Sequence, residues 1–252
     1  MDYGNFHVCD IILRTGGDTR IDVSTYLRRG IPPEAARTAD TIRGIDVVED
    51  PHEPDECGLT LLPPGGEGEG VLVGIRANLV EGEVAGGRPA LCSIADEAAG
   101  SAAEVLSRGP VPRRSPAHPE DSLAWLNACE LLDAEALATA GVRDDEPTVG
   151  VADWECEWSG GDDELVVDVS FHRDQPKDGE NTRRSGYKTT VDPADDGDQC
   201  TVFLEYRQYG GQNTEPAAEM VRLRVEGERT MAELCGTAEA LAADAAARLP
   251  AR

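Results

Sequence analysis

The chain is poor in lysine, in aromatic residues and in long apolar runs. Lys177 and Lys188 are its only lysines, aromatic residues make up 4% of its 252 residues, and 23 basic residues stand against 49 acidic ones, a formal net charge of −26. A chain this acidic repels nucleic-acid phosphates and anionic lipids unless a local basic stripe overrides the net field, and its arginines are scattered singly or in pairs. We therefore expect no nucleic-acid partner.

The sequence also lacks a membrane span and a secretion signal. Its apolar runs are only a few residues long, far short of the ~20 that cross a bilayer. Residues 1–14 contain no basic region followed by an apolar one, which a signal peptide requires. The length predicts one or two domains at roughly 150 residues each. Taken alone, these features would indicate a cytoplasmic protein.

Motifs of catalysis and of metal binding are missing as well. The four histidines are dispersed, no two cysteines form a Cys-x-x-Cys pair, and the glycine-rich stretch 63–70 has two acids and no lysine. Such a stretch would repel a phosphate group. The acidic turn 192–198 lacks the bidentate glutamate of a calcium loop. The sequence thus predicts no catalytic residue, no cofactor and no metal ion.

What the sequence does hold is an internal repeat, marked by its cysteines. Cys57 and Cys92 are 35 positions apart, and so are Cys200 and Cys235. A shift of 143 positions superimposes both pairs, together with several leucines and alanines. A shift of 147 places the opening of the first half on that of the second. Because these coincidences occur in register, a duplicated domain is the best interpretation.

The apolar periodicity predicts the same elements in both halves. Alternate residues are apolar in segments 21–27 and 165–171, as expected for strands with one buried face, whereas 91–106 and 231–249 have the spacing of amphipathic helices. Such strands closed by a helix predict an antiparallel sheet with helices on one side. The expected fold class is α+β, with two tandem domains.

We expect the first domain to cover residues 1–108 and the second to cover 125–252. Between them, residues 109–124 begin with a proline-rich stretch that has no hydrophobic periodicity. Such a composition is typical of a semi-extended spacer.

The repeated spacing also predicts how the cysteines are used. Cys200 would open a strand and Cys235 would lie one turn into the closing helix, so a disulfide would join the helix to the sheet. The same pairing is expected for Cys57 and Cys92, with buried free thiols as the alternative. Paired cysteines indicate an oxidising compartment, in conflict with the missing signal.

The second half opens with a segment that the first half lacks. Residues 127–138 are predicted to form a helix, with Asp133 as a possible cap of its main part. Cys129 would then pair with Cys156, which leaves Cys9 as the odd cysteine. We expect the chain as given to begin inside the first domain, so that a signal peptide or membrane anchor would belong upstream. Intermolecular pairing through Cys9 is the alternative.

The second half resembles a known kind of domain. The opening Asn-Ala-Cys-Glu-Leu-Leu at 127–132, the Trp-Glu-Cys-Glu-Trp at 154–158 and the alanine-rich end at Arg248-Leu249-Pro250 are similar to a secreted actinobacterial lipoprotein domain of unknown function. The resemblance covers residues 125–252, and the first half through the repeat. It implies a cell-envelope protein, lipid- or membrane-anchored, and brings no catalytic residues.

The sequence predicts a broad class of function. We expect a non-enzymatic, extracytoplasmic cell-envelope protein that binds or senses a small ligand or an envelope protein. The alternatives are a hydrolase of envelope material with acidic catalysts and a purely structural module. Trp154 and Trp158 alternate with Cys156 and either pack over its disulfide or face a ligand. The candidate binding face comprises Trp154, Trp158, Tyr206, Tyr209, Arg222 and Arg224, although cross-strand pairing with acids explains the tyrosines and arginines equally well.

Overall fold

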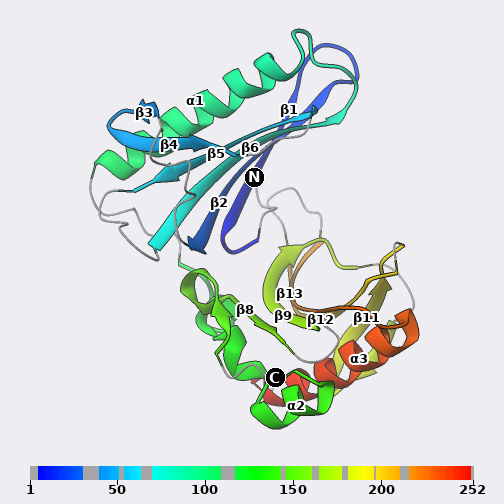
Figure 1. Ribbon diagram of the computed structural model, residues 1–252. Coiled ribbons are helices and arrows are strands. Elements are labelled where there is room, and N and C mark those ends of the chain that lie inside the picture. Colours follow the sequence, from blue (N-terminus) through cyan, green and yellow to red (C-terminus); the bar gives the residue numbers. More distant parts are fainter. Residues whose placement is uncertain are drawn as a thin grey trace. The chain divides into compact units, whose positions relative to one another are not determined.

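The computed structural model describes residues 5–30, 40–50, 54–63, 70–108, 117–142, 146–160, 165–177, 181–195, 197–210 and 216–250. They form two compact units (Figure 1). The first is His7–Ala117, and the second combines residues 5 and 6 with His118–Arg252. Each unit contains one antiparallel sheet with a long helix on it, so the fold class is α+β, as the sequence predicts.

The first unit has six strands and one helix. Its strands are β1 (Val8–Arg14), β2 (Arg20–Gly30), β3 (Asp40–Ile42), β4 (Ile45–Glu49), β5 (Glu56–Leu62) and β6 (Gly70–Glu81), and its helix is α1 (Arg88–Ser107). They form one sheet in the order β1-β2-β6-β5-β4-β3. Helix α1 buries Leu91, Ala95, Ala99 and Ala103, one residue per turn, so a single narrow stripe faces the core.

The second unit begins with short helical segments and then builds a seven-stranded sheet. The segments are η2 (Leu123–Trp125), η3 (Ala128–Leu131), α2 (Ala134–Ala140) and, after β7 (Thr148–Val149), η4 (Val151–Asp153). The other strands are β8 (Glu155–Ser159), β9 (Val166–Asp174), β10 (Asn181–Arg184), β11 (Tyr187–Pro193), β12 (Gln199–Gly210) and β13 (Pro216–Glu226), and α3 (Met231–Arg248) closes the unit. The sheet order is β10-β11-β12-β13-β9-β8-β7.

The two sheets share their strand order and their register. Apart from β7, each strand of the second sheet has a counterpart at the same place in the first. One row across the first sheet holds Cys9, Thr25, Ile75 and Leu59, and the matching row across the second holds Cys156, Val169, Leu223 and Val202. Neighbours in these rows are paired, so the rows define which residues of the two units are equivalent. The segments 21–27 and 165–171 match, as predicted.

Three disulfides join helical segments to the sheets. Cys57–Cys92 links β5 to α1, Cys200–Cys235 links β12 to α3, and Cys129–Cys156 links η3 to β8. Cys9 is free and exposed. These pairings and the odd cysteine are the predicted ones, and they fit a protein of an oxidising compartment.

The predicted domain boundaries need correction at two places. Residues 118–124, assigned to the linker by composition, belong to the second unit, where Leu123 is fully buried and Ser122 is 2% exposed. The prolines of 109–116 dominate the composition of this stretch but lie outside the described residues. Phe6, expected in the first domain, packs against Trp154 of the second unit with 5.4 Å between ring centroids.

None of the helices that the structure describes combines the length and the apolar character needed to span a lipid bilayer.

Candidate functional site

The six residues of the predicted binding face do not share a surface. Trp158 and Tyr206 are each 4% exposed and belong to the core beneath the helices. Arg222 and Arg224 alternate with the core residues Val221, Leu223 and Val225 along β13, so they point to the opposite side of the sheet. The prediction of one aromatic and basic binding face in the second unit is therefore wrong.

The remaining two members of that face make internal contacts. Trp154 lies just before β8 rather than in the strand, and its indole Nε1 donates a hydrogen bond of 3.0 Å to the carbonyl oxygen of Ala124. The hydroxyl of Tyr209 accepts a 3.0 Å hydrogen bond from Nε of Arg173. These contacts hold segments of the second unit together.

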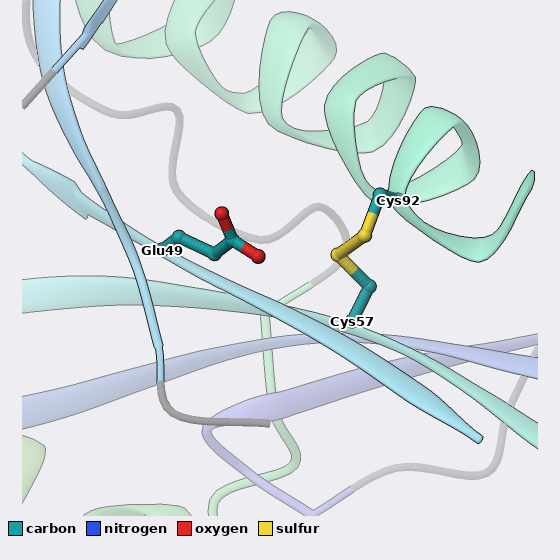
Figure 2. A group of neighbouring side chains, drawn as sticks. All are labelled: Glu49, Cys57 and Cys92. Atoms are coloured by element: carbon teal, nitrogen blue, oxygen red, sulfur yellow. A yellow bond between two sulfur atoms is a disulfide. The ribbon is translucent and has the colours of Figure 1, made fainter. Parts of the chain in front are cut away.

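One trio of potential metal-binding side chains lies at the helix side of the first sheet (Figure 2). Glu49, Cys57 and Cys92 place one possible ligand atom each within 4.8 Å of one another. Both sulfurs, however, are joined in a disulfide, and a metal ion requires thiolates. The carboxylate of Glu49 also pairs with the guanidinium of Arg88. The donor set is therefore that of a disulfide beside an ion pair, not of a metal centre.

A carboxyl cluster lies on the face of the second sheet that points away from α3. Asp168 is fully buried and accepts hydrogen bonds from Nη2 of Arg222 at 2.6 Å and from the hydroxyl of Ser170 at 3.1 Å. Burial raises the pKa of the neighbouring Glu155, and the charges of Asp168 and Glu157 raise it further, while Arg222 lowers it. Because Asp168 does not reach solvent, we assign this cluster a structural role.

The raised pKa makes the stability of the second unit depend on pH. The folded unit retains a proton on Glu155 that the unfolded chain releases near pH 4.3, so stability falls as pH rises from there through the higher folded pKa. We expect Glu155→Gln to stabilise the second unit at pH 7 by a few tenths of a kcal/mol, the scale of like-charge pairs in sheets (about 0.2–1 kcal/mol).

This prediction is checked by urea unfolding at several pH values. Tryptophan fluorescence reports the second unit alone, because Trp125, Trp154 and Trp158, the only tryptophans of the chain, all belong to it. The increase in the free energy of unfolding caused by Glu155→Gln should vanish below about pH 4. Glu228→Gln, at an exposed turn position, is the control. A gain that persists at low pH would contradict the assigned cause.

The helix side of the second sheet is covered at one edge by residues 122–140, which we call the covering segment. It contains η2, η3 and α2, and its residues Leu123, Ala128 and Leu131 are buried in the core. The Cys129–Cys156 disulfide ties it to β8. Asp133 caps α2 by accepting a 2.9 Å hydrogen bond from the backbone N–H of Ala136, as predicted.

A buried carboxylate anchors the beginning of the covering segment. Glu219 is 1% exposed and accepts hydrogen bonds from the Ser122 hydroxyl at 2.8 Å and the Leu123 backbone N–H at 2.9 Å. Nη2 of Arg207 donates a third at 2.6 Å. This anchor was not among the residues predicted from the sequence. Its signal is a single glutamate inside an otherwise apolar stretch at 217–221.

At the same edge of the first sheet, none of the residues that the structure describes forms a covering helical segment. Cys9 is exposed there, and the exposed fractions of Ile11, Leu27 and Val71 are 40%, 37% and 43%. Alternation along β1, β2 and β6 places these residues on the side that α1 covers elsewhere, because their strand neighbours at two-residue spacing, such as Leu13 and Val73, pack in the core. We call Cys9, Ile11, Leu27 and Val71 the uncovered face.

Each residue of the uncovered face has a buried equivalent in the second unit. In register, Cys9, Ile11, Leu27 and Val71 correspond to Cys156, Trp158, Phe171 and Glu219. The exposed fractions of these four equivalents are between 0% and 4%. Among the residues that the structure describes, the first unit has no counterpart of the covering segment. The first unit thus exposes apolar side chains at positions that its sister unit buries under a helical segment.

Comparison with protein-family models, with curated proteins and with solved structures finds no match to this chain.

The uncovered face is the candidate functional site. Its exposed side chains are apolar apart from one thiol, so it can bury apolar surface of a partner and form one covalent bond. The sequence predicts Cys9 as the unpaired cysteine but does not predict a role for Ile11, Leu27 and Val71. These three have the alternation of ordinary core residues, and only the absence of a cover distinguishes them.

Proposed function

We propose that the protein is a non-enzymatic, extracytoplasmic binding module whose first unit holds a partner polypeptide on the uncovered face. The observation that carries the proposal is the exposure of Ile11, Leu27 and Val71 at positions equivalent to buried ones in the second unit. Apolar side chains exposed together on a protein surface mark interaction sites.

Two further observations support the extracytoplasmic location. The three disulfides suit an oxidising compartment. The resemblance of residues 125–252 to secreted lipoprotein domains agrees with a place at the cell envelope. A net charge of −26 keeps such a protein soluble and away from anionic lipid headgroups.

The occupant proposed for the uncovered face is a short apolar helical segment of another polypeptide. The covering segment shows what such an occupant looks like, because it buries the equivalent positions in the second unit. It has acidic residues at 130, 133 and 135 and no basic one. Arg29, exposed on β2 on the side of the uncovered face, provides a complementary charge.

The test uses a fluorescent peptide of residues 122–140 in which serine replaces Cys129, titrated with the full chain and followed by fluorescence anisotropy. We expect saturable binding that the pair Ile11→Asp and Leu27→Asp weakens at least about tenfold, or 1.4 kcal/mol. Ile12→Asp is the matched control, because Ile12 is equally exposed but faces the other side of β1.

Two outcomes would overturn the proposal. One is the absence of saturable binding, or binding that Ile12→Asp weakens as much as the pair does. The other is a dimer of the unmodified chain that the pair abolishes, because the occupant would then be a second copy.

A further inference from the structure

We infer that the partner segment carries a cysteine and is joined to Cys9 by a disulfide, so that the uncovered face is a covalent docking site. This inference rests on the proposed function. It starts from the register of the two sheets, in which Cys9 pairs with Thr25 and Cys156 pairs with Val169 at matching positions. In the second unit, the cysteine at that position is bonded to the segment that covers it.

The surroundings of Cys129 describe the expected partner. The Asn127 side chain accepts a 2.9 Å hydrogen bond from the backbone N–H of Cys129, which fixes the start of the short helix η3. Leu131 and Leu132, two and three residues after the cysteine, are buried at 4% and 5% exposure. The partner segment should therefore present its cysteine in a short helical turn that is followed at once by apolar residues.

The differences between the two faces specify the partner further. The first unit has Ile11 where the second has Trp158, and Leu27 where the second has Phe171. These smaller side chains leave more volume to fill, so the partner should bring bulkier apolar groups than the covering segment does, because interiors are close-packed.

The polar anchor also has no counterpart in the first unit. Val71 stands where Glu219 accepts hydrogen bonds from Ser122 and Leu123. A peptide of residues 122–140 with Ser122→Val should therefore bind the first unit more tightly than the unaltered peptide, since a hydroxyl buried there would lose its hydrogen bond.

The bond forms by thiol–disulfide exchange with a partner cysteine that is already oxidised to a disulfide. The thiolate of Cys9 attacks the partner's sulfur, the partner's S–S bond breaks, and a new S–S bond to Cys9 forms. The leaving thiolate takes up the proton that Cys9 lost, so no further oxidant is needed. Docking of the apolar face raises the effective concentration of the two sulfurs and so accelerates the exchange.

The experiment uses the peptide of residues 122–140 with its natural cysteine, activated as a mixed disulfide with thionitrobenzoate, and the full chain. Release of the thionitrobenzoate chromophore gives the rate of exchange. We expect the rate to exceed that of a scrambled peptide with the same activation by at least about tenfold. The pair Ile11→Asp and Leu27→Asp should remove the excess, whereas Ile12→Asp should keep it. Mass spectrometry should place the peptide on Cys9, with the three native disulfides intact, and Cys9→Ser should give no adduct.

The outcomes separate this inference from the proposed function. If the serine peptide binds but the cysteine peptide reacts no faster than the scrambled one, the face docks a partner without a covalent bond and the inference is wrong. The inference is also wrong if two copies of the chain become joined by a disulfide between their Cys9 residues and no peptide is found on Cys9. If the serine peptide itself does not bind, the proposed function is wrong.

Discussion

Replacement of Glu219 by alanine is expected to lower the free energy of unfolding of the second unit by about 3–5 kcal/mol, the cost of removing one partner from a buried ion pair. The substitution removes the carboxylate that lies 2.6 Å from the guanidinium of Arg207, which is 15% exposed, and leaves that guanidinium only the 70%-exposed Asp121 at 3.6 Å. It also leaves the backbone N–H of Leu123 and the hydroxyl of Ser122 without their acceptor. A buried donor left unsatisfied costs about 1–3 kcal/mol by itself.

Urea unfolding followed by tryptophan fluorescence measures this effect in the second unit. Glu226→Ala is the matched control on the same strand, because the Glu226 side chain is 43% exposed and its ion pair with Arg224 is at the surface. The control should cost no more than about 1 kcal/mol. The double variant Glu219→Leu with Arg207→Met should recover the part of the loss that comes from the buried ion pair, since it leaves no buried charge without a partner. A loss below about 1 kcal/mol for Glu219→Ala would show that the anchor is not needed.

Removal of the Cys200–Cys235 disulfide should cost the second unit up to about 3.8 kcal/mol. This is the loss of loop-closure entropy in the unfolded chain for a loop of about 36 residues. The bond spans 35 positions and joins the first residues of β12 to the second turn of α3. We expect the double variant Cys200→Ala with Cys235→Ala to unfold at lower urea concentration.

The first unit supplies a control of the same loop length. Cys57 and Cys92 are also 35 positions apart, and their removal should leave the tryptophan-detected transition in place, because all three tryptophans lie in the second unit. Equal shifts from both double variants would contradict the assignment of each disulfide to the stability of its own unit.

Much of the fold follows from spacing in the sequence. The two 35-residue cysteine intervals predict the disulfides Cys57–Cys92 and Cys200–Cys235, and period-two alternation predicts the matching strands at 21–27 and 165–171. These features are local in the sequence or occur in both halves, so a pattern seen in one half is supported by its recurrence in the other. The three disulfides and the α+β class are confirmed by the structure.

The predicted site failed because it combined the two faces of one sheet. Tyr206 lies an even number of residues from Cys200 and so faces the core, whereas Arg222 and Arg224 lie on the face that points away from α3. A register shift between Glu205 and Arg207 then places Arg207 opposite Glu219, on the core side. Periodicity within one strand cannot predict such a bulge. The uncovered face was not predicted for another reason. Alternation of apolar residues indicates that one face of a strand is apolar, but it does not show whether another segment packs on that face.

The shared register of the two sheets also locates changes of length between the units. Equivalent residues differ in number by 147 at Cys9, 144 at Thr25, 142 at Val47, 143 at Leu59, 148 at Ile75 and again 143 at Cys92. These steps lie between the named residues. The gain of five residues between Leu59 and Ile75 includes the bulge between Glu205 and Arg207 inside β12, and it is cancelled before Cys92. Comparison of the two units therefore shows which connections of this fold accept insertions. A connection from one unit can be grafted into the other to redesign either unit.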